Sequence, residues 1–175
     1  FIPAGVYSIS IPGPDEDDGL TGDLDITQGV TIRGEGSAST ILDGAGLDRL
    51  LHINDANISA VVYDLAIHNG LLDPDDLLGG GGILSQGNLT LQRVEIAHNS
   101  ALRGGGVRNS QGVLNIIDSQ ILENIAYSEG GGIYGDGKIN IARSNILANQ
   151  AEIGGGVNSD ETLTLTDVYV AQNPT

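Results

Sequence analysis

A run of three glycines followed by Ile or Val recurs four times at nearly constant spacing. The runs begin at Gly80, Gly104, Gly130 and Gly154, in steps of 24, 26 and 24 residues. A fixed period of this size is typical of a solenoid, in which each repeat packs only on its neighbours. The glycine runs therefore constrain the fold before any single residue is considered.

Each repeat also carries the same short alternating segments. The first segments are Leu89–Leu91, Leu114–Ile116, Ile139–Ile141 and Leu163–Leu165, and the second are Val94–Ile96, Ser119–Ile121, Ser144–Ile146 and Val168–Val170. Alternation with period two predicts strands, and no window shows the 3.6-residue period of a helix. We therefore predict an all-β, right-handed parallel β-helix with coils of about 25 residues and three short strands per coil. The right hand is expected because crossovers between parallel strands are almost always right-handed.

The first half of the chain follows the same plan less regularly. We predict one β-helix domain over 1–175, with an N-terminal strand and acidic loop in 1–21 and irregular coils in 22–78. An insertion at 71–78 is expected to bulge from a turn, and four regular coils fill 79–175. The chain begins with Phe1, so we expect a mature or trimmed fragment of a longer chain.

The repeated polar and glycine positions have structural explanations. Asparagines at Asn99, Asn124, Asn149 and Asn173 are expected to form a ladder, each amide bonding to the coils on either side. Asparagine also tolerates the left-handed backbone of a sharp turn. The glycines allow positive φ and close approach of neighbouring coils. A phosphate-binding loop is the alternative, but it needs a following helix and usually a lysine, and the only lysine is Lys138.

Composition excludes several classes of protein. The net charge of −16 with a single lysine argues against nucleic-acid binding. The absence of cysteine excludes a disulfide scaffold and thiol chemistry. No apolar run approaches the ~18 residues of a membrane-spanning helix, so we expect no membrane insertion. Glycine is about twice as frequent as usual and aromatic residues are scarce, which suits a narrow core of Ile, Leu and Val.

The pattern Ile/Val-x-x-Asn-x-Ala, followed by Gly-Gly-Gly-Ile/Val, resembles the repeats of bacterial secreted right-handed β-helix proteins. It is also similar to the repeats of polymorphic outer-membrane proteins. The segments Ile2–Tyr7 and Thr21–Ile26 resemble the region after the Cys-Ser-Leu-Arg-Glu-Ala motif of large bacterial surface proteins, although that motif is missing here. The resemblance implies a parallel β-helix in an extracellular or cell-surface protein of structural or adhesin-like type.

Parallel β-helices of this kind also include polysaccharide lyases and glycoside hydrolases. Asp23 and Asp25 are two residues apart on one predicted strand face, and a hydrolase needs two carboxylates ~5–9.5 Å apart. We favour the alternative that both face solvent at the start of the first coil.

Two arginines, Arg103 and Arg108, flank one glycine run and could bind an acidic sugar. Ion pairing with Glu95, Glu123 or Glu129 of adjacent coils is the favoured interpretation.

Metal and ice binding are weaker alternatives. The acidic loops Asp15–Asp18 and Asp73–Asp76 concentrate oxygen ligands of the kind Ca²⁺ takes, but neither has EF-hand spacing. The three histidines, His52, His68 and His98, do not have the spacing of metal ligands. His68 and His98 flank asparagines of the ladder and are expected to be exposed turn residues. An outward column of Thr90, Asn115, Asn140 and Thr164 is too mixed for the regular threonine array of an ice binder.

The sequence predicts a non-catalytic structural or adhesive module of a secreted or cell-surface bacterial protein. The alternative is a module that binds or cleaves polysaccharide. No catalytic, cofactor or metal-binding residue is assigned, and Ca²⁺ is the only candidate ion. Expected partners are surface glycans or other protein chains, the latter through open ends such as the one at Asn173–Thr175, where an unpaired sheet edge invites association.

Overall fold

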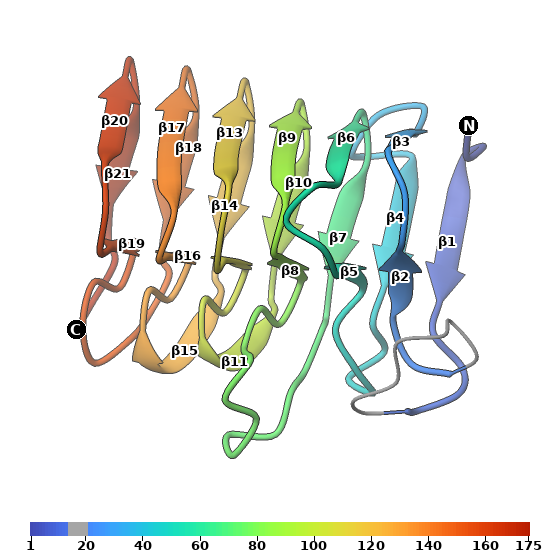
Figure 1. Cartoon of the computed structure of the whole chain (residues 1–175), viewed down its shortest axis with the longest axis horizontal. Helices are drawn as coiled ribbons and strands as arrows, with labels where there is room; N and C mark the ends of the chain where they lie inside the picture. Colours follow the sequence, from blue (N-terminus) through green and yellow to red (C-terminus); the bar gives the residue numbers. More distant parts are fainter. Residues whose placement is uncertain (14–20) are drawn as a thin grey trace.

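The computed structural model describes residues 1–13 and 21–175, which form a parallel β-helix. About six coils stack along one axis, and the described residues contain strands and turns but no helix (Figure 1). The fold class predicted from the glycine period is confirmed. The predicted acidic segment Asp15–Asp18 lies outside the described residues.

Three long parallel sheets run the length of the molecule. Sheet A contains β1 (Gly5–Ser8), β4 (Thr40–Asp43), β7 (Ala66–His68), β10 (Glu95–Ala97), β14 (Gln120–Leu122), β18 (Asn145–Leu147) and β21 (Tyr169–Ala171). Sheet B contains β2 (Leu24–Ile26), β5 (Leu51–Ile53), β8 (Ile83–Ser85), β12 (Val107–Asn109), β16 (Ile133–Gly135) and β19 (Val157–Ser159). Sheet C contains β3 (Val30–Arg33), β6 (Ser59–Tyr63), β9 (Asn88–Gln92), β13 (Val113–Ile117), β17 (Lys138–Ala142) and β20 (Leu163–Thr166).

Each coil passes through sheets B, C and A in that order. In Figure 1 the front strands β6 and β9 point upward, the fainter strands β7 and β10 behind them point downward, and the chain advances from right to left. This sense of turning is right-handed, as parallel crossovers almost always are.

The coils differ from the prediction by one short extra sheet. β11 (Ser100–Arg103) and β15 (Ile125–Glu129) pair in parallel after the asparagine turn, so two coils have a fourth strand. The N-terminal strand β1, Gly5–Ser8, lies within the region 1–21 where a strand is predicted. The insertion bulges from the body as expected (Figure 1).

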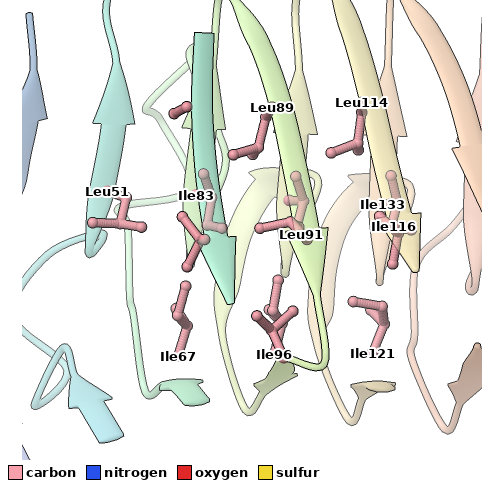
Figure 2. Close-up of a cluster of buried hydrophobic side chains, with 14 of the residues drawn as sticks. Leu51, Ile67, Ile83, Leu89, Leu91, Ile96, Leu114, Ile116, Ile121 and Ile133 are labelled. Atoms are coloured by element: carbon pink, nitrogen blue, oxygen red, sulfur yellow. The ribbon is translucent and has the colours of Figure 1, made fainter. Parts of the chain in front are cut away.

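The core is a set of aliphatic columns inside the coils (Figure 2). Leu89, Leu114 and Ile139 lie in register on adjacent strands of sheet C and are fully buried. Ile67, Ile96 and Ile121 form a matching column in sheet A. Burying such side chains contributes about 1.5–3 kcal/mol each, which is the main force holding the coils together.

The predicted asparagine ladder is confirmed. The side-chain Nδ2 of Asn99 donates to Oδ1 of Asn124 at 3.0 Å, and Asn124 to Asn149 at 2.9 Å. Asn149 continues the series to Asn173 at 3.0 Å. Each backbone N–H of these three residues donates to the same oxygen, so every rung closes two bonds between coils.

One detail of the ladder differs from the prediction. The left-handed backbone occurs one residue before each rung, at residues such as His98 (φ 59°) and Glu123 (φ 53°), and not at the asparagines. Asn69 is such a residue, with φ 58°, and the backbone N–H of Gly70 takes the rung position by donating to Asn99 Oδ1 at 2.8 Å.

Within each glycine run the three positions have different roles. The first has a positive φ, as at Gly130 (63°). The second and third pass so close to other coils that a Cβ would collide with backbone carbonyls. At Gly131 a Cβ would strike the carbonyl oxygens of Gln150 and Gly155. The structural interpretation of the glycines is confirmed.

Candidate functional site

A column of alternating charge follows the turn between sheets C and A. Asp64, Arg93, Asp118, Arg143 and Asp167 occupy equivalent left-handed positions in successive coils, with φ between 49° and 57°. Arg93 binds Asp64 through two bonds of 2.6 and 3.0 Å, and Arg143 binds Asp118 through bonds of 2.7 and 3.0 Å. We call these five residues the charge column.

The arginines change the titration of the carboxylates in this column. Hydrogen bonds from Arg93 lower the pKa of Asp64, and hydrogen bonds from Arg143 lower the pKa of Asp118. A second arginine lowers the pKa of each carboxylate further by its charge, Arg33 for Asp64 and Arg93 for Asp118. Each of these two aspartates is therefore stabilised in its charged form by two arginines.

Serines form a second, buried ladder at the start of the sheet A strands. The backbone N–H of Val94 donates to Ser119 Oγ at 3.2 Å, and that of Ser119 donates to Ser144 Oγ at 3.1 Å. The serine hydroxyls in turn donate to the carbonyls of Ile117 and Ala142. The polar groups at this turn therefore also bond coil to coil.

Convergent ionisable groups occur on the outer face of sheet B. Asp25 and His52 are neighbours in register between β2 and β5. His52 Nδ1 lies 3.2 Å from Asp25 Oδ1, and their side chains are only 7% and 2% exposed. One residue before β2, Asp23 Oδ2 forms an ion pair of 2.7 Å with Arg49 Nε, again with both side chains buried.

The expectation that Asp23 and Asp25 face solvent is wrong. Arg49 also donates to the carbonyl of Gly79 at 2.9 Å and lies 3.4 Å from Asp76 of the insertion. Farther along sheet B, Arg108 donates to the carbonyls of Leu77 and Leu78, both at 2.6 Å. The two arginines thus bind the insertion to the rod beside this buried cluster.

The structure places His52 beside Asp23 and Asp25, which the spacing of these residues in the sequence did not predict. One ligand atom from each of Asp23, Asp25 and His52 lies within 4.8 Å of the others. Two carboxylates and an imidazole suit a divalent cation or acid–base chemistry. Arg49 already supplies a positive charge to Asp23, which offsets part of the negative charge that would attract a cation.

A second polar cluster surrounds Tyr134 in sheet B. The Tyr134 hydroxyl lies 3.0 Å from Asp136 Oδ1 and 2.8 Å from Asp160 Oδ2. Burial, together with these hydrogen bonds, raises the pKa of the tyrosine above its usual range. The guanidinium carbons of Arg103 and Arg108 lie 5.7 and 5.4 Å from the ring centroid, a cation–π distance.

The two arginines that could have bound an acidic sugar take protein partners instead. Arg103 pairs with Glu129 at 3.0 Å, as the favoured interpretation predicts. Arg108 pairs with Asp136 at 3.2 Å and not with one of the predicted glutamates.

The other predicted partners, Glu95 and Glu123, pair with histidines. His68 Nε2 lies 3.0 Å from Glu95, and His98 Nδ1 lies 3.5 Å from Glu123. His98 is an exposed turn residue as expected. His68 is half-buried in β7, so the expectation of an exposed turn residue is wrong for it.

The last two candidates from the sequence are the outward column on sheet C and the acidic loop Asp73–Asp76. The column of Thr90, Asn115, Asn140 and Thr164 is in register on sheet C. In the loop Asp73–Asp76, carboxylate oxygens of Asp73 and Asp76 accept backbone N–H bonds from Asp75 and Leu78. Calcium binding by this loop stays a prediction.

Comparison with protein-family models, with curated proteins and with solved structures finds no match in any of the three. Among the described residues, no helix has the length and apolar character needed to cross a membrane.

Proposed function

We propose that this chain is a non-catalytic structural or adhesive module of a secreted or cell-surface bacterial protein. In this role the β-helix is a stiff rod whose ends and outer faces contact other protein chains or surface glycans. The resemblance of its repeats to bacterial surface proteins supports the location.

One observation carries the proposal: the repeated polar side chains bond coils to each other. The asparagine ladder, the serine ladder and the charge column all follow this rule. A polar side chain that recurs in successive coils because it joins them need not contact a ligand. The amide of Asn124 is 0% exposed, so a ligand cannot contact it in this structure.

The second candidate function is binding or cleavage of polysaccharide. The buried cluster of Asp23, Asp25 and His52 favours it, because two carboxylates and an imidazole converge there. Such groups can act as acid and base on a glycosidic bond or hold a cation beside an acidic sugar, but their side chains are only 2–7% exposed, so this function also requires that the cluster becomes accessible to the sugar.

Incubation with a panel of acidic and neutral polysaccharides separates the two functions. We expect no increase in reducing ends or unsaturated products, with and without added Ca²⁺. Steady turnover that disappears in Asp25→Asn, but persists in the exposed-loop variant Asp73→Asn, would establish the second function and overturn the first.

A further inference from the structure

We propose that the insertion 71–78 is a docking loop for a partner protein chain, and that the groove at its base takes an arginine or lysine side chain of that partner. The residues of the partner beside this cation are apolar. The inference rests on the proposed role as a structural or adhesive module. It specifies where on the rod the module contacts another chain and which chemistry the contact selects.

The insertion projects from the side of the rod and exposes three leucines (Figure 1). Leu71, Leu77 and Leu78 are 44%, 74% and 45% exposed. Insertions in solenoid proteins gather on one face, which is often the binding face, and clustered apolar side chains on a surface mark interaction sites. The place where the coil plan is interrupted is therefore also a place suited to contact another chain.

Hydrogen bonds at both ends and inside the insertion hold it in place. At its start, the backbone N–H of Leu72 donates to a carbonyl of the next coil at 3.0 Å. At its end, the buried Arg49 donates to the carbonyl of Gly79 at 2.9 Å. Between them, Asp73 Oδ1 accepts from the backbone N–H of Asp75 at 2.9 Å. A loop that is already ordered loses little conformational freedom on binding, so its exposed leucines are presented at low entropic cost.

A groove of about 390 Å³ lies between the insertion and the turn that contains Leu47. This volume is within the range of about 300–1,000 Å³ of binding pockets. Lysine and arginine bury their methylene stems on apolar surface and direct the charged head toward carboxylates, so a groove of mixed lining suits them. The groove has such a lining, with leucines and aspartates together: Leu47, Leu71, Leu72, Asp73, Asp75 and Asp76.

The aspartates of the insertion set the sign of the partner. Asp73 and Asp75 are exposed, and neither forms an ion pair with another residue in the part of the chain that the structure describes. The arginines that contact the insertion, Arg49 and Arg108, already pair with other aspartates. The net charge of −16 adds a long-range attraction for a basic segment.

A second copy of this chain is a poor occupant of the groove. Two copies that each carry a charge of −16 repel one another. Anionic polysaccharides and anionic membranes are repelled for the same reason. Five of the seven Lys and Arg residues of a copy already pair with its own carboxylates: Arg49, Arg93, Arg103, Arg108 and Arg143.

Selection from a random peptide library displayed on phage, against the whole protein at about 0.15 M salt, identifies the preferred segment. We expect the enriched peptides to contain an arginine or lysine beside Leu, Ile, Val or Phe. Synthetic copies of them should bind in solution at one peptide per chain by isothermal titration calorimetry. Replacing the basic residue of the peptide with glutamine should weaken binding about fivefold or more, because an ion pair is lost.

Substitutions in the protein assign the binding to the groove. Asp75→Lys should weaken binding of the enriched peptides about fivefold or more, because attraction becomes repulsion. Its side chain is exposed, so we expect an unchanged denaturation midpoint. The control Glu161→Lys changes the net charge equally at an exposed site between β19 and β20 and should leave the affinity unchanged.

Several results would overturn the proposal. They are the absence of a saturable binder, enriched peptides that lack arginine and lysine, and equal losses of affinity in Asp75→Lys and Glu161→Lys. Self-association of the wild type that Asp75→Lys abolishes would assign the groove to a second copy. Loss of peptide binding on adding CaCl₂ at about 1 mM, but not on adding NaCl of equal ionic strength, would assign it to Ca²⁺. None of these results depends on the polysaccharide assay, which tests the proposed function separately.

Discussion

Replacing the buried amide of Asn124 with the methyl group of alanine is expected to lower the free energy of unfolding by about 4 kcal/mol. The substitution removes the oxygen that accepts from both the backbone N–H and the Nδ2 of Asn99, each at 3.0 Å. It also removes the donor that binds the carbonyl of Ile96 at 2.9 Å. A buried polar group left without its partner costs about 1–3 kcal/mol, and several such groups result here.

Chemical denaturation of the wild type and the variant measures this loss. The matched control is Asn140→Ala, which removes an exposed asparagine on the outside of the next coil, where the side chain donates to Asn115 at 3.0 Å. We expect a change within about 0.5 kcal/mol for this surface site. Equal losses for the two variants would show that the buried ladder has no special role.

Gly131→Ala is expected to destabilise the protein by about 3 kcal/mol. The φ of Gly131 is not positive, so alanine causes no backbone strain there. The loss of stability therefore reports only the close approach of neighbouring coils. The new methyl group would collide with the carbonyl oxygens of Gln150 and Gly155, and both belong to backbone that cannot rotate away as a side chain can. The coils must move apart locally, which weakens the bonds between them.

The control for this substitution is Gly29→Ala in the first coil. A Cβ at Gly29 meets only the Ser59 carbonyl oxygen, at an ordinary 3.5 Å. The free energy of unfolding should stay equal or rise slightly, because alanine restricts the unfolded chain. If Gly131→Ala unfolds at the same denaturant concentration as Gly29→Ala, the glycine runs are not required for close stacking.

The coil plan could be predicted because period and alternation are local properties of the sequence. The aliphatic positions Leu114 and Ile139 define strands by their spacing alone, and the structure pairs them in register. The position of Gly70 beside Asn99 could also have been predicted from the sequence. Aligning Ile67 with Ile96, which pair in sheet A, places Gly70 and not Asn69 opposite Asn99.

The burial of Asp25 and His52 could not be read from the sequence. Alternation places both on the outward face of sheet B, where a polar residue is expected to be solvated. Arg49, Arg108 and the insertion lie on that side of the rod, and these contacts join residues about 30 positions apart. No periodic signal encodes where an insertion folds back. The serine ladder did have a signal, since Ser119 and Ser144 recur at 25 residues, but serine in a strand window does not by itself predict a buried hydroxyl.

Native-state hydrogen exchange tests most directly the central claim that repeated polar side chains join the coils into one rod. The account predicts that the amides of strands β8–β10, β12–β14 and β16–β18 all exchange with the same free energy of opening. It also predicts that Asn124→Ala lowers this value in the coils of both Asn99 and Asn149, because each rung links neighbouring coils. Separate opening free energies for the three coils, with loss of protection in Asn124→Ala confined to the substituted coil, would contradict it.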